Sequence, residues 1–369
     1  MHISKLKLTN FKNYSFADIS FSSGYNLITG KNGEGKTNLL DAIYFLCMTK
    51  SYFHYSEKNV VKLDANFFRI EGHFEDSNES KVVCKYRLDG GKVFEVNDKE
   101  IGRYSHYIGT FPVVMIAPND IHLIEEGSEE RRKFIDTSIC QVDMHYLQAL
   151  NAYNKLLKQR NSILRQINRN QSGQYDLVDY YTQQMATLCV DIIAKRAEFT
   201  TQVSAGFDRI YDTITESREV AGCNYFPNVK GTEVEIISEF KAALRKDLIL
   251  ERTTRGIHRD DLEFLLHGEP VKRIGSQGQI KSAIFAAKLA QYQWLSEKKA
   301  ELPILLLDDI FDKLDHDRVG KVLQLIDTAD YGQIFITDTY ADRNREILSY
   351  LHKPVSQYQV EAGGIHVRT

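Results

Sequence analysis

The N-terminal part of the chain alternates hydrophobic and polar residues in a way that predicts β-strands. In the stretch ISKLKLTNF, lysine and leucine alternate, which is the period of a half-buried strand. A short strand is also predicted in GYNLITG, and it leads directly into a glycine-rich loop. Behind the loop, Leu39, Ile43 and Leu46 recur at helical spacing and predict one apolar helix face.

Further strands are predicted downstream. Three alternating runs between Phe67 and Ile101, separated by the turn sequences DSNES and DGG, predict an antiparallel meander, and FPVVMIAP predicts one more strand. Near the C-terminus, LPILLLDD and QIFITDT have the continuous apolar runs of buried strands. Strands interleaved with helices indicate an α/β fold.

Between about Glu129 and Glu216 the pattern becomes helical and proline is absent. Leu150, Leu157 and Leu164 follow one another at heptad spacing. The heptads end after about three repeats, fewer than a free-standing coiled coil needs, so we expect a short helical hairpin packed on another part of the chain. We therefore expect an α/β head made from residues 1–125 and 250–369, with an inserted helical lid or arm at 126–249.

Composition adds three expectations. A chain of 369 residues with 43% hydrophobic residues can bury a sizeable core, and its formal charge of −3 means that any nucleic-acid binding must come from a local patch. No apolar run reaches the roughly 18 residues that span a bilayer, so we expect a cytosolic protein without a membrane partner. The five cysteines form no C-x-x-C pair, which favours buried thiols over a zinc site or disulfides.

The stretch GKNGEGKT, from Gly30 to Thr37, satisfies the P-loop pattern G-x-x-x-x-G-K-[ST] and follows a predicted strand. Glycines let backbone N–H groups curl around phosphate oxygens, Lys36 reaches the β and γ phosphates, and Thr37 offers a hydroxyl to Mg²⁺. ATP and Mg²⁺ are therefore the expected cofactors. The expected nucleotide-binding residues here are Gly30, Lys31, Asn32, Gly33, Glu34, Gly35, Lys36, Thr37 and Asn38.

The run PILLLDD delivers Asp308 and Asp309 to the carboxyl end of a buried strand, where ligands bind in open α/β sheets. Beside a P-loop, Asp308 is expected to hold Mg²⁺ and Asp309 to orient the attacking water. A solvated acidic turn after a buried strand is the alternative.

A second glycine loop precedes the helix predicted in SQGQIKSAIFAAKL. A serine hydroxyl, exposed N–H groups and a helix N-terminus form another anion-binding device, which one ATP site does not need. Two such devices per chain suggest that ATP lies between two chains, with Ser276 of one chain completing the site of the other. The alternative is an ordinary N-cap by Ser276. The residues concerned are Ser276, Gln277, Gly278 and Gln279.

The order of these motifs resembles the ABC-type ATPase heads of the SMC class and, within it, the RecF family of bacterial recombination mediators. The resemblance rests on LKLTNFKNY, LITGKNGEGKTNLLDAIYFL, GSEERRKFID, GIHRDDLEF, GSQGQIKSAIFAAKLA, LLLDDIFDKLD and QIFITDT, and it spans nearly the whole chain. It implies a P-loop NTPase of ABC-type head architecture, with a mixed central sheet, an antiparallel meander and an inserted helical arm. Two departures are Asp312-Lys313, where the family tends to have Ser-Glu, and Thr337-Asp338-Thr339, which lacks the switch histidine of transporter ATPases.

The resemblance also implies a function. Such a protein would dimerise on binding ATP, clamp duplex DNA or the junctions of gapped DNA, and release it on slow, DNA-stimulated hydrolysis. It would assist RecO and RecR in loading RecA during recombinational repair, with Asp309, Lys36 and the second chain's Ser276 in catalysis. Two alternatives are an ABC-type ATPase that acts on a non-DNA partner and a monomeric P-loop kinase.

Basic residues of the helical insertion are the candidate phosphate contacts, although a solvated helix surface is the alternative. The principal candidates are Arg131, Arg132, Lys133, Lys155, Lys158 and Arg160, followed by Arg165, Arg169, Lys195 and Arg196. The stretch His258-Arg259-Asp260-Asp261 would either sense nucleotide or DNA or tie a loop to the core through an Arg–Asp pair.

Overall fold

The structure is a computed structural model that describes residues 1–368 apart from 55, 77, 171–174, 217–218, 310–315, 340–342 and 362. The chain forms two compact units. The first comprises Met1–Asp120, Ile210–Arg218 and Ser276–Thr369, and the second comprises Ile121–Arg209 and Glu219–Gly275. The sequence predicts domain boundaries at residues 125 and 250, and this division stays a prediction. The compact units differ from it in one respect, because residues 250–275 belong to the mostly helical second unit.

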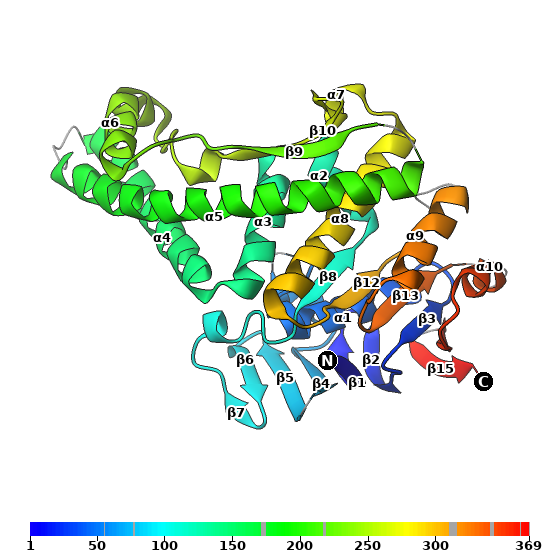
Figure 1. Ribbon diagram of the computed structural model, residues 1–369. Helices are drawn as coiled ribbons and strands as arrows, with labels where there is room; N and C mark the ends of the chain where they lie inside the picture. The colour runs from blue at the N-terminus through cyan, green and yellow to red at the C-terminus, as the bar shows by residue number, and fades with distance from the viewer. Residues whose placement is uncertain are drawn as a thin grey trace. The chain divides into compact units, whose positions relative to one another are not determined.

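The first unit contains two six-stranded sheets (Figure 1). The antiparallel sheet has the order β2-β1-β4-β5-β6-β7, formed by β1 His2–Phe11, β2 Tyr14–Ser20, β4 Phe67–Glu75, β5 Glu79–Arg87, β6 Gly91–Val96 and β7 Lys99–Glu100. The other sheet has the order β15-β14-β3-β13-β12-β8, formed by β3 Tyr25–Thr29, β8 Val113–Ile116, β12 Ile304–Leu307, β13 Ile334–Asp338, β14 Val355–Glu361 and β15 Gly364–Arg368. The predicted meander and buried strands are confirmed.

All strands of the second sheet run parallel except β15, which pairs antiparallel with β14. Strands β3, β8, β12 and β13 are buried along their whole length, as their apolar runs predict. The run FPVVMIAP, which follows the meander in sequence, supplies β8 of this parallel sheet. The β14–β15 pair and β2 were not predicted, since their patterns are mixed.

Helix α1, Lys36–Met48, follows β3 and is buried on nearly every side. One cluster of buried side chains joins α1 to residues of both sheets, including Ile3, Phe45 and Leu306. The predicted apolar face of Leu39, Ile43 and Leu46 is buried, and burial extends to the other sides of the helix because two sheets cover it. Helices α8 Gln277–Lys299, α9 His316–Thr328 and α10 Arg343–Tyr350 complete the unit.

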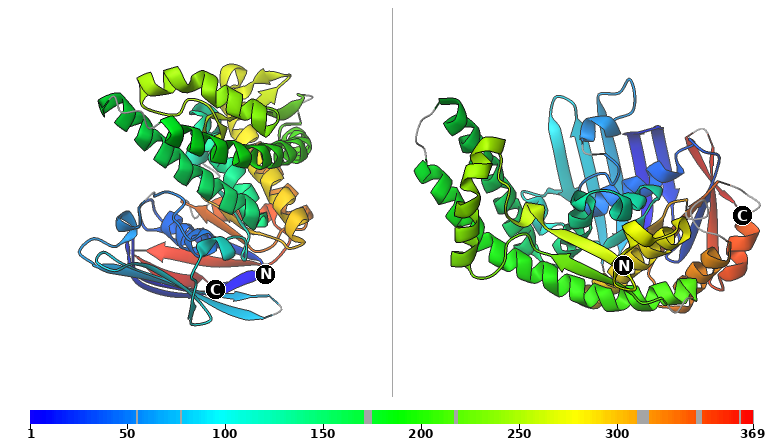
Figure 2. Two further views of the ribbon diagram at one scale, coloured as in Figure 1. Left: turned by 90° about the vertical axis from the view of Figure 1, so that its left-hand side faces the viewer. Right: turned by 90° about the horizontal axis from the view of Figure 1, so that it is seen from above.

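The second unit is mostly helical (Figure 2). Its helices are α2 His122–Glu125, α3 Ser128–Val142, α4 Met144–Asn170, α5 Tyr175–Thr215, α6 Glu233–Leu250 and α7 Val271–Ile274, with the last residues of α5 counted in the first unit. A small sheet has the order β11-β10-β9, formed by β9 Ala221–Phe226, β10 Asp261–Leu266 and β11 Glu269–Pro270. Short 3₁₀ helices in the two units span Glu57–Val60, Tyr104–His106, Pro118–Ile121 and Ile257–Arg259.

Helices α4 and α5 form the predicted hairpin, but with 27 and 41 residues they are longer than the short hairpin expected, and α6 packs beside α4. The buried side of α4 coincides only in part with the heptad-spaced leucines. It runs through Tyr146, Tyr153, Arg160 and Ile167, whereas Leu150 and Leu157 of the leucine heptad are only half-buried. Leu164, the third leucine of the heptad, is fully buried, so the interior side of α4 combines aliphatic, aromatic and polar side chains.

Candidate functional site

The P-loop joins β3 to α1 in a conformation that requires glycine. Gly33 and Gly35 have φ angles of 85° and 116°, in the left-handed region. A Cβ on Gly35 would overlap the Asn13 side chain, and one on Gly30 would overlap the backbone oxygen of Val360. The loop is therefore held close to neighbouring elements at two points, and its glycines cannot be exchanged for larger residues without a shift.

Two residues of the first hairpin hold the loop in place. Asn13 Nδ2 donates to the carbonyl oxygen of Glu34 at 2.7 Å, and the Tyr14 hydroxyl donates to that of Gly35 at 3.0 Å. Asn38 Nδ2, in the first turn of α1, donates to Asn13 Oδ1 at 2.8 Å. These bonds use carbonyl oxygens of the loop, which leaves its N–H groups as the natural partners of phosphate oxygens.

Lys36 lies at the start of α1 and is buried. Its Nζ donates to the carbonyl oxygens of Gly30 at 2.8 Å and Lys31 at 3.1 Å. The ammonium group thus folds back over the loop that would surround the phosphates. Exchanging these neutral carbonyls for phosphate oxygens would give Lys36 charge-assisted hydrogen bonds, which are about twice as strong as neutral ones.

Asp308 follows β12 and meets Thr37 at the carboxyl edge of the parallel sheet. Thr37 Oγ1 donates to Asp308, at 2.9 Å from Oδ1 and 3.0 Å from Oδ2, and Thr337 Oγ1 donates to Oδ1 at 2.8 Å. Burial raises the pKa of Asp308 to about 6, although both hydroxyls stabilise the carboxylate.

The pair suits Mg²⁺. A carboxylate and a hydroxyl are hard oxygen ligands, and magnesium commonly takes one or two carboxylates together with phosphate oxygens. A buried carboxylate whose pKa is raised also gains from a nearby cation. Thr37 and Asp308 are therefore the residues that would hold the ion.

Asp309 is the next residue along the chain and has an unusual backbone. Its φ is 45°, which is uncommon for a residue other than glycine. Its N–H donates to Thr337 Oγ1 at 2.9 Å, and Thr339 Oγ1 donates to its Oδ1 at 3.3 Å. Because of this turn, the two consecutive carboxylates lie in different surroundings. Asp308 is buried, whereas Asp309 is half-buried. The neighbouring Asp312-Lys313 departure lies outside the described residues.

Ser276 begins α8 as its N-cap. Its Oγ accepts from the N–H of Gln279 at 3.3 Å, and Gln279 Oε1 accepts from the N–H of Ser276 at 2.7 Å, which forms a capping box. Ser276 and Gln277 are exposed. A Cβ on Gly278 would overlap the guanidinium group of Arg318 from α9. The capping box is the N-cap that the sequence left as the alternative, and the exposed serine hydroxyl can still donate a hydrogen bond to a further partner.

The chain is similar to known proteins along nearly its whole length. Residues 2–361 match the family described as the RecF/RecN/SMC N terminal domain. The chain is 39% identical to the DNA replication and repair protein RecF of Cytophaga hutchinsonii, over 99% of this chain and 96% of that protein. It is also 39% identical to RecF of Flavobacterium johnsoniae, over 96% and 98%. The chain belongs to the RecF family.

Solved structures support the fold of a RecF-family ABC-type ATPase. The recombination mediator RecF with ATP, from the RecFOR pathway, aligns with a TM-score of 0.89 at 28% identity, over 100% of this chain and 98% of that one. An Smc head bound to the C-winged helix domain of ScpA aligns at 17% identity with a TM-score of 0.58, over 100% and 97%, and shows a shared fold. The expected fold class is confirmed.

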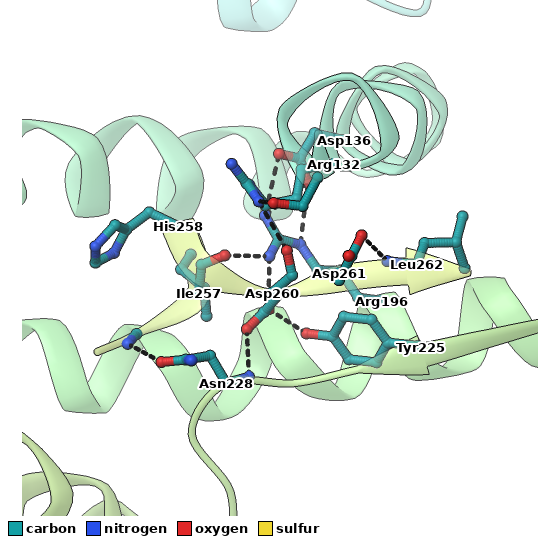
Figure 3. Close-up of polar contacts among 12 residues, drawn as sticks. Arg132, Asp136, Arg196, Tyr225, Asn228, Ile257, His258, Asp260, Asp261 and Leu262 are labelled. Atoms are coloured by element: carbon teal, nitrogen blue, oxygen red, sulfur yellow. Dashed lines mark hydrogen bonds and ion pairs between the residues drawn. The ribbon is translucent and has the colours of Figure 1, made fainter. Parts of the chain in front are cut away.

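The stretch His258-Arg259-Asp260-Asp261 organises the second unit (Figure 3). Asp260 is fully buried and accepts from Arg196 Nη1 at 2.7 Å, from the N–H of Asn228 at 2.8 Å and from the Tyr225 hydroxyl. Burial raises the pKa of Asp260, while these donors favour its ionised form. Of the two interpretations left open by the sequence, the contacts support the Arg–Asp pair that ties a loop to the core.

His258 is neutral in this network. Its Nε2 lies 3.0 Å from the carbonyl oxygen of Thr253, and its Nδ1 lies 2.8 Å from the Tyr153 hydroxyl. Because a carbonyl only accepts, Nε2 carries the proton and Nδ1 accepts from Tyr153. Burial lowers the pKa of His258 to about 4, in agreement with a structural role.

The structure divides the expected DNA contacts into two groups. Arg160 is 1% exposed and donates to Asp247 at 2.7 Å, Arg131 pairs with Asp261 at 2.7 Å and 3.0 Å, and Arg196 is also buried. Their charges are already paired inside the unit, which argues against phosphate contacts. Arg132 is half-buried and donates to the carbonyl oxygen of Asp260 at 2.8 Å.

The second group is accessible. Lys155, Lys158 and Arg165 are exposed on α4, and they have no ion pair within the described residues. Lys133 pairs with Glu130 at 3.3 Å, and Lys195 pairs with Asp143 at 3.0 Å. The side chain of Arg169 lies outside the described residues. DNA contact by the accessible lysines stays a prediction.

Sequence reasoning did not assign Thr337, Asn13 or Tyr14 to the site. Thr337 was considered only as the place of a missing histidine, yet its hydroxyl links the backbone of Asp309 to the carboxylate of Asp308. A threonine at the end of a buried parallel strand next to the Asp308 strand was the available signal. Asn13 and Tyr14 come from a hairpin whose proximity to the P-loop no local pattern reveals.

No helix within the described residues is long and apolar enough to cross a membrane. The five cysteines are all buried with free thiols, as the sequence pattern predicts.

Proposed function

We propose that this protein is an ATP-dependent DNA-binding protein of recombinational repair that works as an ATP-bound dimer. The observation that carries the proposal is the Thr37–Asp308 hydrogen bond beside the P-loop, together with an exposed Ser276 at the start of α8. Similarity to RecF proteins at 39% identity supports the same function. ATP would bind between two chains, each supplying the P-loop for one nucleotide and Ser276 for the other.

In this proposal each residue of the site has a separate role in ATP hydrolysis. N–H groups of the P-loop would bind the β phosphate, and Lys36 would move from the loop carbonyls to the β and γ phosphates. Thr37 and Asp308 would hold Mg²⁺, which supplies positive charge against the phosphates when bound. Asp309 would orient the water for in-line attack on the γ phosphate. Ser276 of the second chain would donate a hydrogen bond to the same phosphate.

In this proposal the dimer clamps duplex or gapped DNA, and hydrolysis, weak and stimulated by DNA, releases it. The chain would work in the cytoplasm with RecO and RecR in loading RecA, the partners that the RecFOR pathway of its solved relative suggests. The accessible lysines Lys133, Lys155 and Lys158 would contribute phosphate contacts.

Analytical sedimentation tests the proposal. The protein is sedimented with and without ATP and Mg²⁺, each with and without a gapped duplex, and Asp309→Asn is included to slow turnover. We expect ATP to convert monomer into dimer, and the dimer to co-sediment with DNA less as salt rises. A protein that binds ATP but stays monomeric and does not bind DNA would instead be a P-loop enzyme of another kind. A dimer that does not bind DNA would act on a different partner.

A further inference from the structure

A groove that contains two basic side chains lies on the second unit, beside the loop that the buried Arg160 holds in place. It has a volume of about 510 Å³ and is lined by Ala242, Ala243 and Lys246 of α6, by Thr254 and Arg255 after it, and by Asn228 and Glu239. Helix α6 lies beside the α4–α5 hairpin (Figure 1). All residues that line the groove belong to the second unit.

Basic side chains outnumber acidic ones in the lining of this groove, with Lys246 and Arg255 against Glu239. Residues 241–255 include five basic residues, Lys241, Arg245, Lys246, Arg252 and Arg255, against two acidic ones, Asp247 and Glu251. All five basic side chains are exposed, whereas Asp247 is fully buried against Arg160. Lys241, Arg245, Lys246 and Arg252 have no ion pair in the part of the chain that the structure describes. The exposed charge of residues 241–255 is thus positive, whereas residues 233–255 as a whole contain five basic and five acidic residues.

The wall that carries Arg255 is held rigidly from inside. Asp247 Oδ1 accepts from the N–H of Thr254 at 2.8 Å and from its hydroxyl at 2.6 Å, while Asp247 Oδ2 accepts from Arg160. Arg160 Nη1 also donates to the Thr253 hydroxyl at 2.8 Å. The buried arginine predicted to touch DNA is therefore a positioning residue for the loop beside the groove.

The other side of the loop is fixed by Asn228. The N–H of Gly256 donates to Asn228 Oδ1 at 3.1 Å, and Arg255 Nη1 donates to the carbonyl oxygen of Asn228 at 3.1 Å. Gly256 has a φ of 121°, and a Cβ there would overlap the Tyr153 hydroxyl. Glu239, the acidic residue of the lining, lies 4.0 Å from Arg255, at the limit of an ion pair. Because this wall is preorganised, little conformational entropy would be lost when a ligand binds.

We infer that this groove binds the sugar-phosphate backbone of DNA, independently of base sequence. Lysine, arginine, asparagine and threonine side chains are the types that contact phosphate oxygens. The lining contains no aromatic ring on which a base could stack and no large apolar pocket for a peptide side chain. The inference rests on the proposed DNA-binding function and places part of that contact at Lys246 and Arg255.

The test measures binding of a fluorescein-labelled DNA duplex by anisotropy, with ATP and Mg²⁺, over a range of salt concentrations. The variant is the full chain with Lys246→Gln and Arg255→Gln. Loss of two phosphate contacts should lower the slope of log affinity against log salt by about 2 and weaken binding roughly 60-fold at 0.1 M salt. A conservative variant, Arg255→Lys, should retain most of the affinity.

The matched control is Lys99→Gln with Arg103→Gln, which removes one lysine and one arginine from exposed positions of the first unit. These residues have no ion pair in the described ranges, and the control should bind DNA like the parent protein. A control that weakens as much as the groove variant would overturn the inference, since net charge alone would then explain the loss.

Other outcomes are equally decisive. A groove variant with unchanged affinity and salt slope, measured against a parent that does bind DNA, overturns the inference and leaves the proposed function intact. Unchanged DNA binding combined with lost binding of poly-L-glutamate would assign the groove to an acidic protein segment, which also overturns it. If the parent protein binds no duplex DNA under any of these conditions, the proposed function fails and the inference falls with it. ATP-dependent sedimentation of the variant should match the parent, which separates the groove from the nucleotide site.

Discussion

Thr37 and Asp308 stand 271 positions apart in the chain and are joined by a hydrogen bond, with Thr37 Oγ1 at 2.9 Å from Asp308 Oδ1. The hydroxyl gives its hydrogen to the carboxylate and keeps its lone pairs for another partner. A magnesium ion that met the threonine oxygen would therefore find a negative charge directly behind it. The relationship joins the two halves of the candidate metal site.

Thr37→Val should remove most of the Mg²⁺-dependent part of ATP binding. The substitution keeps the shape of the side chain but deletes the hydroxyl. We expect ATP affinity with Mg²⁺ to fall by at least about tenfold, as is common when a group that supports a metal is lost. Affinity in EDTA should change little. Titration with a fluorescent ATP analogue measures both, and Thr37→Ser is the control; equal losses with and without Mg²⁺ would contradict the assignment.

Asp308 should make the nucleotide-free protein less stable as pH rises from about 4 to above 6. Its pKa is raised from 3.8 to about 6, so the folded protein holds this proton more tightly than the unfolded chain does. The stabilisation from Asp308 is complete below the unfolded pKa and is lost as pH rises through 6, up to about 3 kcal/mol.

Urea unfolding at several pH values measures this dependence. Asp308→Asn carries no titratable proton, so the difference in unfolding free energy between variant and parent should increase from pH 4 to pH 7 in favour of the variant. The same variant should lose Mg²⁺-dependent ATP hydrolysis. A constant difference across this range would show that the carboxyl group is not perturbed.

Two substitutions at Ser276 separate helix capping from contact with a second chain. Ser276→Asp keeps a good N-cap but places a negative charge where a γ phosphate is expected, and Ser276→Arg adds a bulky cation. Both variants should bind ATP like the parent and fail to dimerise with it in sedimentation. Ser276→Thr, which retains cap and hydroxyl, should dimerise. Normal dimerisation of the Asp and Arg variants would reduce Ser276 to a helix cap.

Arg160→Gln should destabilise the protein by about 3–5 kcal/mol, because it leaves Asp247 as a buried carboxylate without its partner. Lys158→Gln, two residues earlier on the exposed side of the same helix, should change stability by about 0.5 kcal/mol or less. Urea unfolding followed by circular dichroism compares the two. An Arg160→Gln protein that is as stable as the parent but binds DNA weakly would restore Arg160 to the list of DNA contacts.

Much of the site could be predicted because its chemistry is local in sequence. Gly30 to Thr37 contain the turn, the lysine and the hydroxyl of the P-loop, and the run ending at Asp308 is apolar enough to identify a buried strand. The Ser276 capping box is equally local, since Ser276 and Gln279 satisfy each other within one helical turn. In these cases a short run of neighbouring residues determines the conformation.

The basic residues of the arm show where sequence reasoning stops. Charge alone could not separate Arg160, which is buried, from Lys158, which is exposed, because the two differ only in which side of α4 faces the interior. Arg160 can lie in the interior because Asp247 and Thr253 lie opposite it and balance its burial. That compensation comes from a segment about 90 positions away.

The sequence by itself determined the P-loop, the Asp308–Asp309 pair, the cap at Ser276 and the alternation of α/β and helical segments, since each depends on residues within a few turns or one strand. Only the tertiary structure decided that Thr337 bridges Asp308 and Asp309, that α1 is covered on both sides, and that Lys246 and Arg255 share a groove. Those relationships depend on which distant strands and helices pack together. Packing sets the burial of a charge, and burial decides whether that charge holds the fold together or remains free to meet a ligand.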